Sequence, residues 1–199
     1  MTKGRLEAFS DGVLAILITI MVLELKTPNS PDLAALRPML PVFGSYLLSF
    51  VFLGIYWNNH HHLLQASRYV SGQIMWANLH LLFWLSLVPF VTSWMGATGF
   101  APLPVAAYGV VLLLAACSFT ILVRVLIARH GRDSTLAAAV GRDYKGKLSL
   151  VLYLLAIPSA FFNAWVACAL FVVVALIWLI PDPRIEKRLE TAESDGLVD

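Results

Sequence analysis

The chain has 199 residues, of which 59% are hydrophobic and only 13% are charged, and its formal net charge is +2. A soluble domain carries about 25% charged residues, so this composition excludes an ordinary soluble globular protein. The small net charge and the lack of a basic patch interleaved with aromatic residues argue against nucleic-acid binding. Both cysteines, Cys117 and Cys168, lie within apolar runs, where they are predicted to be buried core residues and not a disulfide or a metal site.

Six apolar segments qualify, or nearly qualify, as membrane-spanning helices, which need ~20 mostly apolar residues. The first four are predicted over residues 9–25, 39–60, 73–94 and 103–127. The fifth and sixth share one continuous apolar stretch, which we divide near residues 162–163 because a single helix of that length would far exceed the bilayer.

Prolines and one serine predict several helix ends. Pro158 is expected to kink the fifth helix near its end, and Pro181 and Pro183 to stop the sixth. Between the first and second helices, Ser30 is expected to cap a short helical turn in which Pro31 is the first residue.

Basic residues are distributed unevenly between the loops. Most Lys and Arg residues fall at the amino terminus, in the loops after the second and fourth segments and after the sixth, whereas the opposite loops hold only Lys26 and Arg37. The positive-inside rule therefore predicts an even number of spans and both termini in the cytoplasm. We expect residues 1–183 to form one six-helix transmembrane domain and residues 184–199 a charged cytoplasmic tail.

The first helix is predicted to have two different faces. Ile16, Ile20 and Leu23 follow the i, i+4, i+7 spacing of one stripe, with Thr19 beside it. Asp11 lies about 140° around the helix from Ile16 and would face the rest of the bundle. Ordinary readings remain open here, since the stripe is also typical of lipid contact and Asp11 could form an ion pair with Arg5.

Polar residues in the second and third segments lie at the same depth as Ser10 and Asp11. Intramembrane ionisable groups are costly and usually mark a function or a compulsory polar network. A cluster at one level satisfies its own hydrogen bonds, which isolated groups cannot do. Its expected members are Asn58, Asn59, His60, His61, Asn78 and His80.

Metal binding and catalysis find little support in these residues. His60, His61 and His62 are adjacent, so on a helix they point in different directions and do not easily share one ion. No nucleophile is paired with a base in a recognisable motif. We therefore expect no enzyme activity and no bound cofactor.

The motif Arg-x-x-x-Phe-Ser-Asp, formed by Arg5, Phe9, Ser10 and Asp11, resembles the signature of the transmembrane protein 175 family of potassium channels. A Trp-Asn-x-His element in the second helix and an Asn-x-His element followed by Pro-Phe in the third add weaker support. Their residues are Trp57, Asn58, His60, Asn78, His80, Pro89 and Phe90.

The resemblance implies a bacterial, single-repeat member in the inner membrane: an all-α homotetramer in which the first helix of each subunit lines the pore. Its narrow hydrophobic residues would then be Ile16, Ile20 and Leu23, with Thr19 supplying a ring of hydroxyl groups. Aliphatic rings exclude water from a closed pore. The expected function is a moderately potassium-selective cation channel, with potassium only as the permeant ion.

The same resemblance implies a structural role for the motif in the first helix. Arg5, Phe9, Ser10 and Asp11 would tie that helix to the second and third helices. The expected partners are Trp57, Asn59 or His60, and His80.

Two other functions remain open from the residues alone. Asp11 and His80 could form the relay of a proton leak or a proton-coupled transporter. The protein could also be a non-conducting membrane scaffold, which would show no ion flux at all in liposomes.

Overall fold

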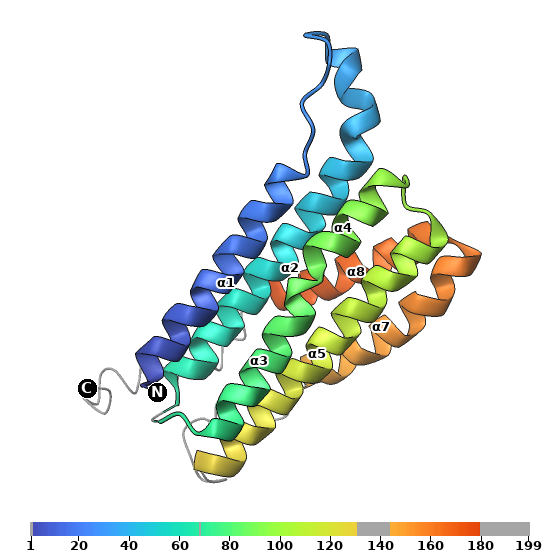
Figure 1. Cartoon of the computed structure of the whole chain (residues 1–199). Helices are drawn as coiled ribbons and strands as arrows, with labels where there is room; N and C mark the ends of the chain where they lie inside the picture. Colours follow the sequence, from blue (N-terminus) through green and yellow to red (C-terminus); the bar gives the residue numbers. More distant parts are fainter. Residues whose placement is uncertain (1, 68, 131–143, 180–199) are drawn as a thin grey trace.

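The computed structural model describes residues 2–67, 69–130 and 144–179. These ranges are helical apart from short connections (Figure 1). The elements are α1 (Lys3–Leu23), the 3₁₀ helix η1 (Leu33–Met39), α2 (Leu40–Gln65), α3 (Gly72–Ser86), α4 (Val88–Ala97), α5 (Pro102–His130), α7 (Tyr144–Phe162) and α8 (Ala164–Leu179). The predicted tail, residues 184–199, lies outside the described residues.

Each of the six predicted spans corresponds to a helix or a helix pair. Five of these spans are at least 18 residues long and apolar enough to cross a membrane, and α8 is shorter, with 16 residues. The predicted division near 162–163 is confirmed, because α7 ends at Phe162 and α8 begins at Ala164. Asn163 stands between them, and its side-chain Oδ1 accepts the Trp165 N–H at 3.0 Å, as a helix cap does.

The third span differs from the single helix that was predicted. It consists of α3 and α4, which are separated at Leu87. Pro89 stands in the first turn of α4, where its missing N–H removes a bond that a continuous helix would need. Pro158 acts less strongly, since α7 runs through it to Phe162.

α1 and α2 extend furthest beyond the predicted apolar segments. α1 begins at Lys3 and not at residue 9, and α2 continues to Gln65 and not only to residue 60. The Lys3 ammonium donates to the Gln65 carbonyl at 2.8 Å, which joins the two helix ends. Hydropathy marks the part of a helix that lies in lipid, so polar turns at its ends escape a length estimate based on the bilayer.

The turn before α2 forms at a different residue from the one predicted. The 3₁₀ helix η1 starts at Leu33, and its N-cap position is Asp32 and not Ser30. Ser30 instead accepts the Asp32 N–H and donates to the Asp32 carboxylate at 2.7 Å. In Figure 1 this segment projects beyond the ends of the other helices.

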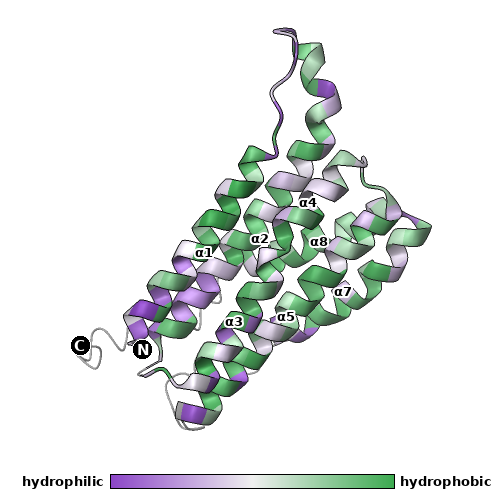
Figure 2. Ribbon diagram, viewed as in Figure 1, coloured by the Kyte–Doolittle hydropathy of each residue, from purple (hydrophilic) through white to green (hydrophobic). Residues whose placement is uncertain are grey.

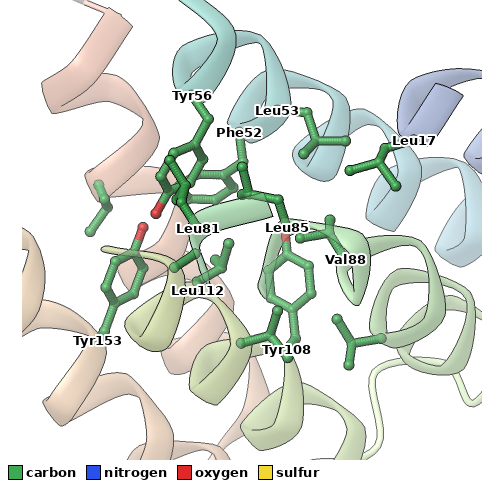
Figure 3. Packing of buried hydrophobic residues seen from close by; sticks show 14 of the residues in the cluster. Leu17, Phe52, Leu53, Tyr56, Leu81, Leu85, Val88, Tyr108, Leu112 and Tyr153 are labelled. Carbon is green, nitrogen blue, oxygen red and sulfur yellow. The ribbon is translucent and has the colours of Figure 1, made fainter. Parts of the chain in front are cut away.

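The helices pack around an apolar core in which α1 occupies the edge. α1 packs on α2, α3 and α4, whereas α5 packs on α3 and α7, and α8 on α7. Figure 3 shows aromatic and aliphatic side chains meeting at the centre, with Phe52 and Tyr108 in edge-to-face contact. α1 gives this core only a narrow stripe of side chains, which are Leu6, Ser10, Leu14, Leu17 and Met21. The opposite face of α1 is therefore uncovered.

Apolar side chains also cover much of the outer surface. Figure 2 shows hydrophobic residues along the middle of the bundle and hydrophilic residues gathered near the lower ends of α1 and α2. Large side chains such as Phe83, Leu155 and Trp165 are more than half exposed. Water would disfavour such a surface and a lipid bilayer favours it, so this is a membrane protein.

Gly96 lets α4 approach the start of α2 closely. A Cβ added at this position would lie 2.8 Å from the Cα of Val42 and would also clash with the Ser45 hydroxyl. We expect Gly96→Ala to lower the free energy of unfolding by about 1–3 kcal/mol, because the backbone must shift to make room. Thermal unfolding of the purified protein in detergent measures this effect.

A matched variant separates the clash from the general effect of placing alanine in a helix. Gly54 lies within α2, and apart from the adjoining backbone of its own helix a Cβ there would meet nothing within 4 Å. Gly54→Ala should leave the melting temperature unchanged or raise it, because alanine favours helix over glycine by about 1 kcal/mol. Equal melting temperatures for the two variants would contradict the close approach.

Candidate functional site

The uncovered face of α1 carries the apolar stripe that the sequence predicts as pore lining. Ile16 is 57% exposed, Ile20 41% and Leu23 80%, and Phe9 extends the same face toward the start of the helix. Thr19 is also exposed, and its hydroxyl donates to the Ile16 carbonyl at 2.9 Å. That bond uses the Thr19 proton, so the oxygen of this exposed side chain can still act as an acceptor.

The opposite face of α1 is held by a chain of buried hydrogen bonds. The Ser10 hydroxyl accepts from the Asn78 amide at 2.9 Å and donates to the Leu6 carbonyl at 2.9 Å. Asn78 Oδ1 lies 2.6 Å from His60 Nε2. Since an amide oxygen only accepts, Nε2 carries the proton. One amide thus joins α1, α2 and α3.

All three side chains of this chain of bonds are removed from solvent. Ser10 and Asn78 are fully buried, and His60 is 2% exposed. Buried polar groups are stable only when they are paired, and the described part of the protein leaves no fully occluded side-chain nitrogen or oxygen without a partner. The chain of bonds therefore fixes the position and rotation of α1 against its neighbours.

Asp11 forms a second link between α1 and α2. The indole N–H of Trp57 donates to Asp11 Oδ1 at 3.0 Å, at a partly exposed position. Arg5 does not pair with Asp11: within the described residues, the ion pair at this end of α1 joins Lys3 to Glu7 at 3.9 Å. The acid in this apolar helix is thus held by an indole from the neighbouring helix.

Asn59 and His80 lie elsewhere than expected. The Asn59 amide donates to the Ile55 carbonyl of its own helix at 2.8 Å. His80 is exposed and accepts the Trp84 indole N–H at 3.1 Å, also within its own helix. Residues two apart on a helix point about 200° apart, so His80 faces outward when Asn78 faces α1. Asp11 and His80 consequently share no hydrogen bond.

The far end of the exposed stripe holds a feature that sequence reasoning missed. Glu24 directly follows the last residue of α1, and its carboxylate accepts the Ser93 hydroxyl of α4 at 3.0 Å. The two residues belong to an open groove of about 500 Å³, which also includes Ile20, Phe90 and Trp94. The sequence does show an acidic residue, Glu24, at the end of an apolar helix. That position alone does not predict which residue pairs with the carboxylate.

Comparisons with known proteins find relatives described as potassium channels. The family model described as endosomal/lysosomal potassium channel TMEM175 matches residues 5–89, which hold most of α1, all of α2 and α3, and the first two residues of α4. A protein named potassium channel from Chryseobacterium sp. (strain P1-3) is 55% identical over 190 residues, which cover 96% of this chain and 99% of that relative.

Two further relatives extend the comparison. The crystal structure of a lysosomal potassium-selective channel TMEM175 homolog from Chamaesiphon minutus matches with a TM-score of 0.77 at 27% identity, over 89% of this chain and 96% of that chain. The human endosomal/lysosomal proton channel TMEM175 is 39% identical over an alignment of 84 residues, and the match covers 34% of this chain and 17% of that protein. The near-complete match to the Chryseobacterium protein and the family match over the motif-bearing helices show that this chain belongs to the TMEM175 family.

Proposed function

We propose that the protein is a potassium-selective cation channel in which four copies surround a pore lined by α1. The observation that carries this proposal is the division of α1 into two faces. One face is tied to α2 and α3 by buried hydrogen bonds, and the other leaves an aliphatic stripe 41–80% exposed. The family relationship to proteins named potassium channels favours a pore over lipid as the surroundings of that stripe.

Closure follows from the chemistry of the stripe. Four copies of Ile16, Ile20 and Leu23 would form three aliphatic rings, and rings of this kind expel water from a narrow pore. An unhydrated ion in an apolar medium is disfavoured by about tens of kcal/mol, so a dry constriction does not conduct. A small rotation or dilation that admits water would open it.

Selectivity would arise where the ion loses part of its water. Potassium gives up hydration more readily than sodium, so a narrow wet pore favours it. The exposed Thr19 side chain is next to Ile20 in the sequence, and its oxygen would replace part of the lost hydration. Because hydroxyl rings replace only some of the water, we propose weaker selectivity than that of channels with carbonyl filters.

The proposal includes an orientation in the bacterial inner membrane. Residues 1–183 would form the channel domain, with both termini in the cytoplasm, as the distribution of basic residues favours. The end of α1 with Ser10 and Asp11 would then lie on the cytoplasmic side, and Glu24 would lie at the outer mouth.

Reconstitution into vesicles tests the proposal. With a tenfold potassium gradient balanced by sodium, the equilibrium potential of potassium has a magnitude of about 59 mV. We expect a reversal potential of the same sign as this value but of smaller magnitude. Mass measurement of the protein in lipid nanodiscs should give four copies. A lack of ion flux, or a stable assembly of another number, would contradict the proposal.

Proton permeation is the second candidate, favoured by the name of the human relative as a proton channel. The same vesicles, loaded with a pH-sensitive dye and placed in a proton gradient without permeant metal ions, distinguish the two. Proton flux that persists in the His80→Ala variant would count against a relay through Asp11 and His80.

A further inference from the structure

A cavity of about 50 Å³ lies between α2, α5, α7 and α8, away from α1. Its walls are mainly apolar and include Phe52, Ile55 and Phe119. None of the described residues that line it is charged. One water needs about 10–15 Å³ of such volume, so the cavity has room for a ligand of several non-hydrogen atoms.

Two tyrosines aim unpaired hydroxyl groups into this cavity. Tyr56 is 9% exposed and Tyr153 is 2% exposed, and both belong to the cavity wall. Figure 3 shows the two hydroxyl groups pointing toward each other from α2 and α7. Within the described residues neither hydroxyl has a hydrogen-bond partner, whereas every fully occluded side-chain nitrogen or oxygen has one. The two phenol oxygens are therefore reached from the cavity.

The other hydroxyl groups of the wall are already bonded. The Ser149 hydroxyl donates to the Lys145 carbonyl and accepts the Trp178 indole N–H at 2.8 Å. The Thr120 hydroxyl donates to the Ala116 carbonyl at 2.9 Å. Asn59 also belongs to the wall, and its amide donates to the Ile55 carbonyl at 2.8 Å. The two phenols are therefore the wall hydroxyl groups that remain for a ligand.

We propose that this cavity binds a small aliphatic alcohol. A ligand hydroxyl between the two phenols would donate to one oxygen and accept from the other, which satisfies both buried groups. A short alkyl chain would lie against Phe52, Ile55 and Phe119. Water in the same place would make no favourable apolar contact with these side chains. An ion is disfavoured because no charged side chain among the described wall residues would pair with it.

Fluorine NMR of the full chain in lipid nanodiscs tests the proposal, with 3-fluorotyrosine as label and 1-propanol as probe. Resonances are assigned from single Tyr→Phe variants. We expect saturable shifts of the Tyr56 and Tyr153 resonances, with half-saturation at ~1 mM or above for a ligand of four non-hydrogen atoms. The readout needs no ion flux, so it is independent of the proposed channel function.

Tyr108 is the matched control. It is fully buried and packs against the same Phe171 as Tyr153, but its hydroxyl already accepts a hydrogen bond from Ser49 at 3.0 Å. Its resonance should not respond to 1-propanol. Tyr153→Phe should weaken binding about three- to tenfold when followed at Tyr56, as expected for one lost hydrogen bond, and Tyr108→Phe should not.

Three outcomes would overturn the proposal. One is a shift that grows linearly with 1-propanol and is equal at Tyr108, which is a solvent effect. Another is the absence of any shift at Tyr56 and Tyr153, which would leave water as the occupant. The third is unchanged affinity in Tyr153→Phe while the Tyr108 resonance keeps its position, since the fold is then intact and the phenol is not used.

Discussion

Replacing Ile16 with Asn is expected to raise single-channel conductance about tenfold and to lower the selectivity for potassium over sodium. A tenfold increase corresponds to a barrier lowered by about 1.4 kcal/mol. The amide would place a polar ring at the first aliphatic level of the proposed pore, which admits water and lets sodium keep its hydration. Ile16 is 57% exposed and lies opposite the buried face of α1, so the folded bundle should accept the change. Planar-bilayer recording with mixed potassium and sodium solutions measures both quantities.

Val22→Asn is the control for this prediction. Val22 is also an apolar residue of α1 and is 45% exposed, but it lies about 120° around the helix from Ile16. Its replacement should change conductance little. Wild-type currents in Ile16→Asn, or equal increases in both variants, would place the permeation path elsewhere.

Replacing Asn78 with Leu is expected to lower the free energy of unfolding by about 2 kcal/mol and to weaken assembly. The change removes the acceptor of His60 and the donor to Ser10, which are both buried. A buried group left without a partner costs about 1–3 kcal/mol. Interhelical hydrogen bonds in membranes contribute only about 0.6 kcal/mol on average, so the unpaired imidazole should dominate the effect. Denaturant unfolding in mixed micelles measures the loss.

Asn59→Leu makes the same chemical change where no other helix is involved. Its amide donates only to the carbonyl of Ile55 in its own helix, so stability should change by less than about 0.5 kcal/mol. The double variant His60→Leu with Asn78→Leu should recover part of the loss, because both partners are then apolar. An additive double variant would show that the two side chains act independently.

The length and apolar character of the segments were sufficient to predict an all-helical membrane protein and the positions of its apolar helices. Lipid offers no water to backbone polar groups, and a helix satisfies these groups within one segment, so a long apolar run favours a helix. The division at Asn163 follows from the same length argument. The break at Leu87 was not predicted. α7 continues through Pro158, whereas α3 ends shortly before Pro89, so the presence of a proline does not by itself tell whether a helix continues. The packing around each proline decides the outcome.

The candidate site was predicted less evenly. The motif resemblance identified Ser10 and Asp11 as residues that anchor the first helix, and periodicity placed Ile16, Ile20 and Leu23 on one stripe. The residue that bonds Ser10 is Asn78 and not His80, although both are polar and occur in the same helix. Which of them faces α1 depends on the rotation of α3 in the bundle.

The sequence by itself therefore determined that the chain lies in a membrane, how many apolar segments it has, and which residues share a helix face. These properties depend on composition and on spacing along one chain. Only the tertiary structure decided which helix faces meet. It thereby also decided that Asn78 links α1 to α2 and α3, that Glu24 contacts Ser93, and that two phenols have no partner among the described residues. Such contacts join residues that are far apart in the chain, and their geometry is set by the close packing of several helices at once.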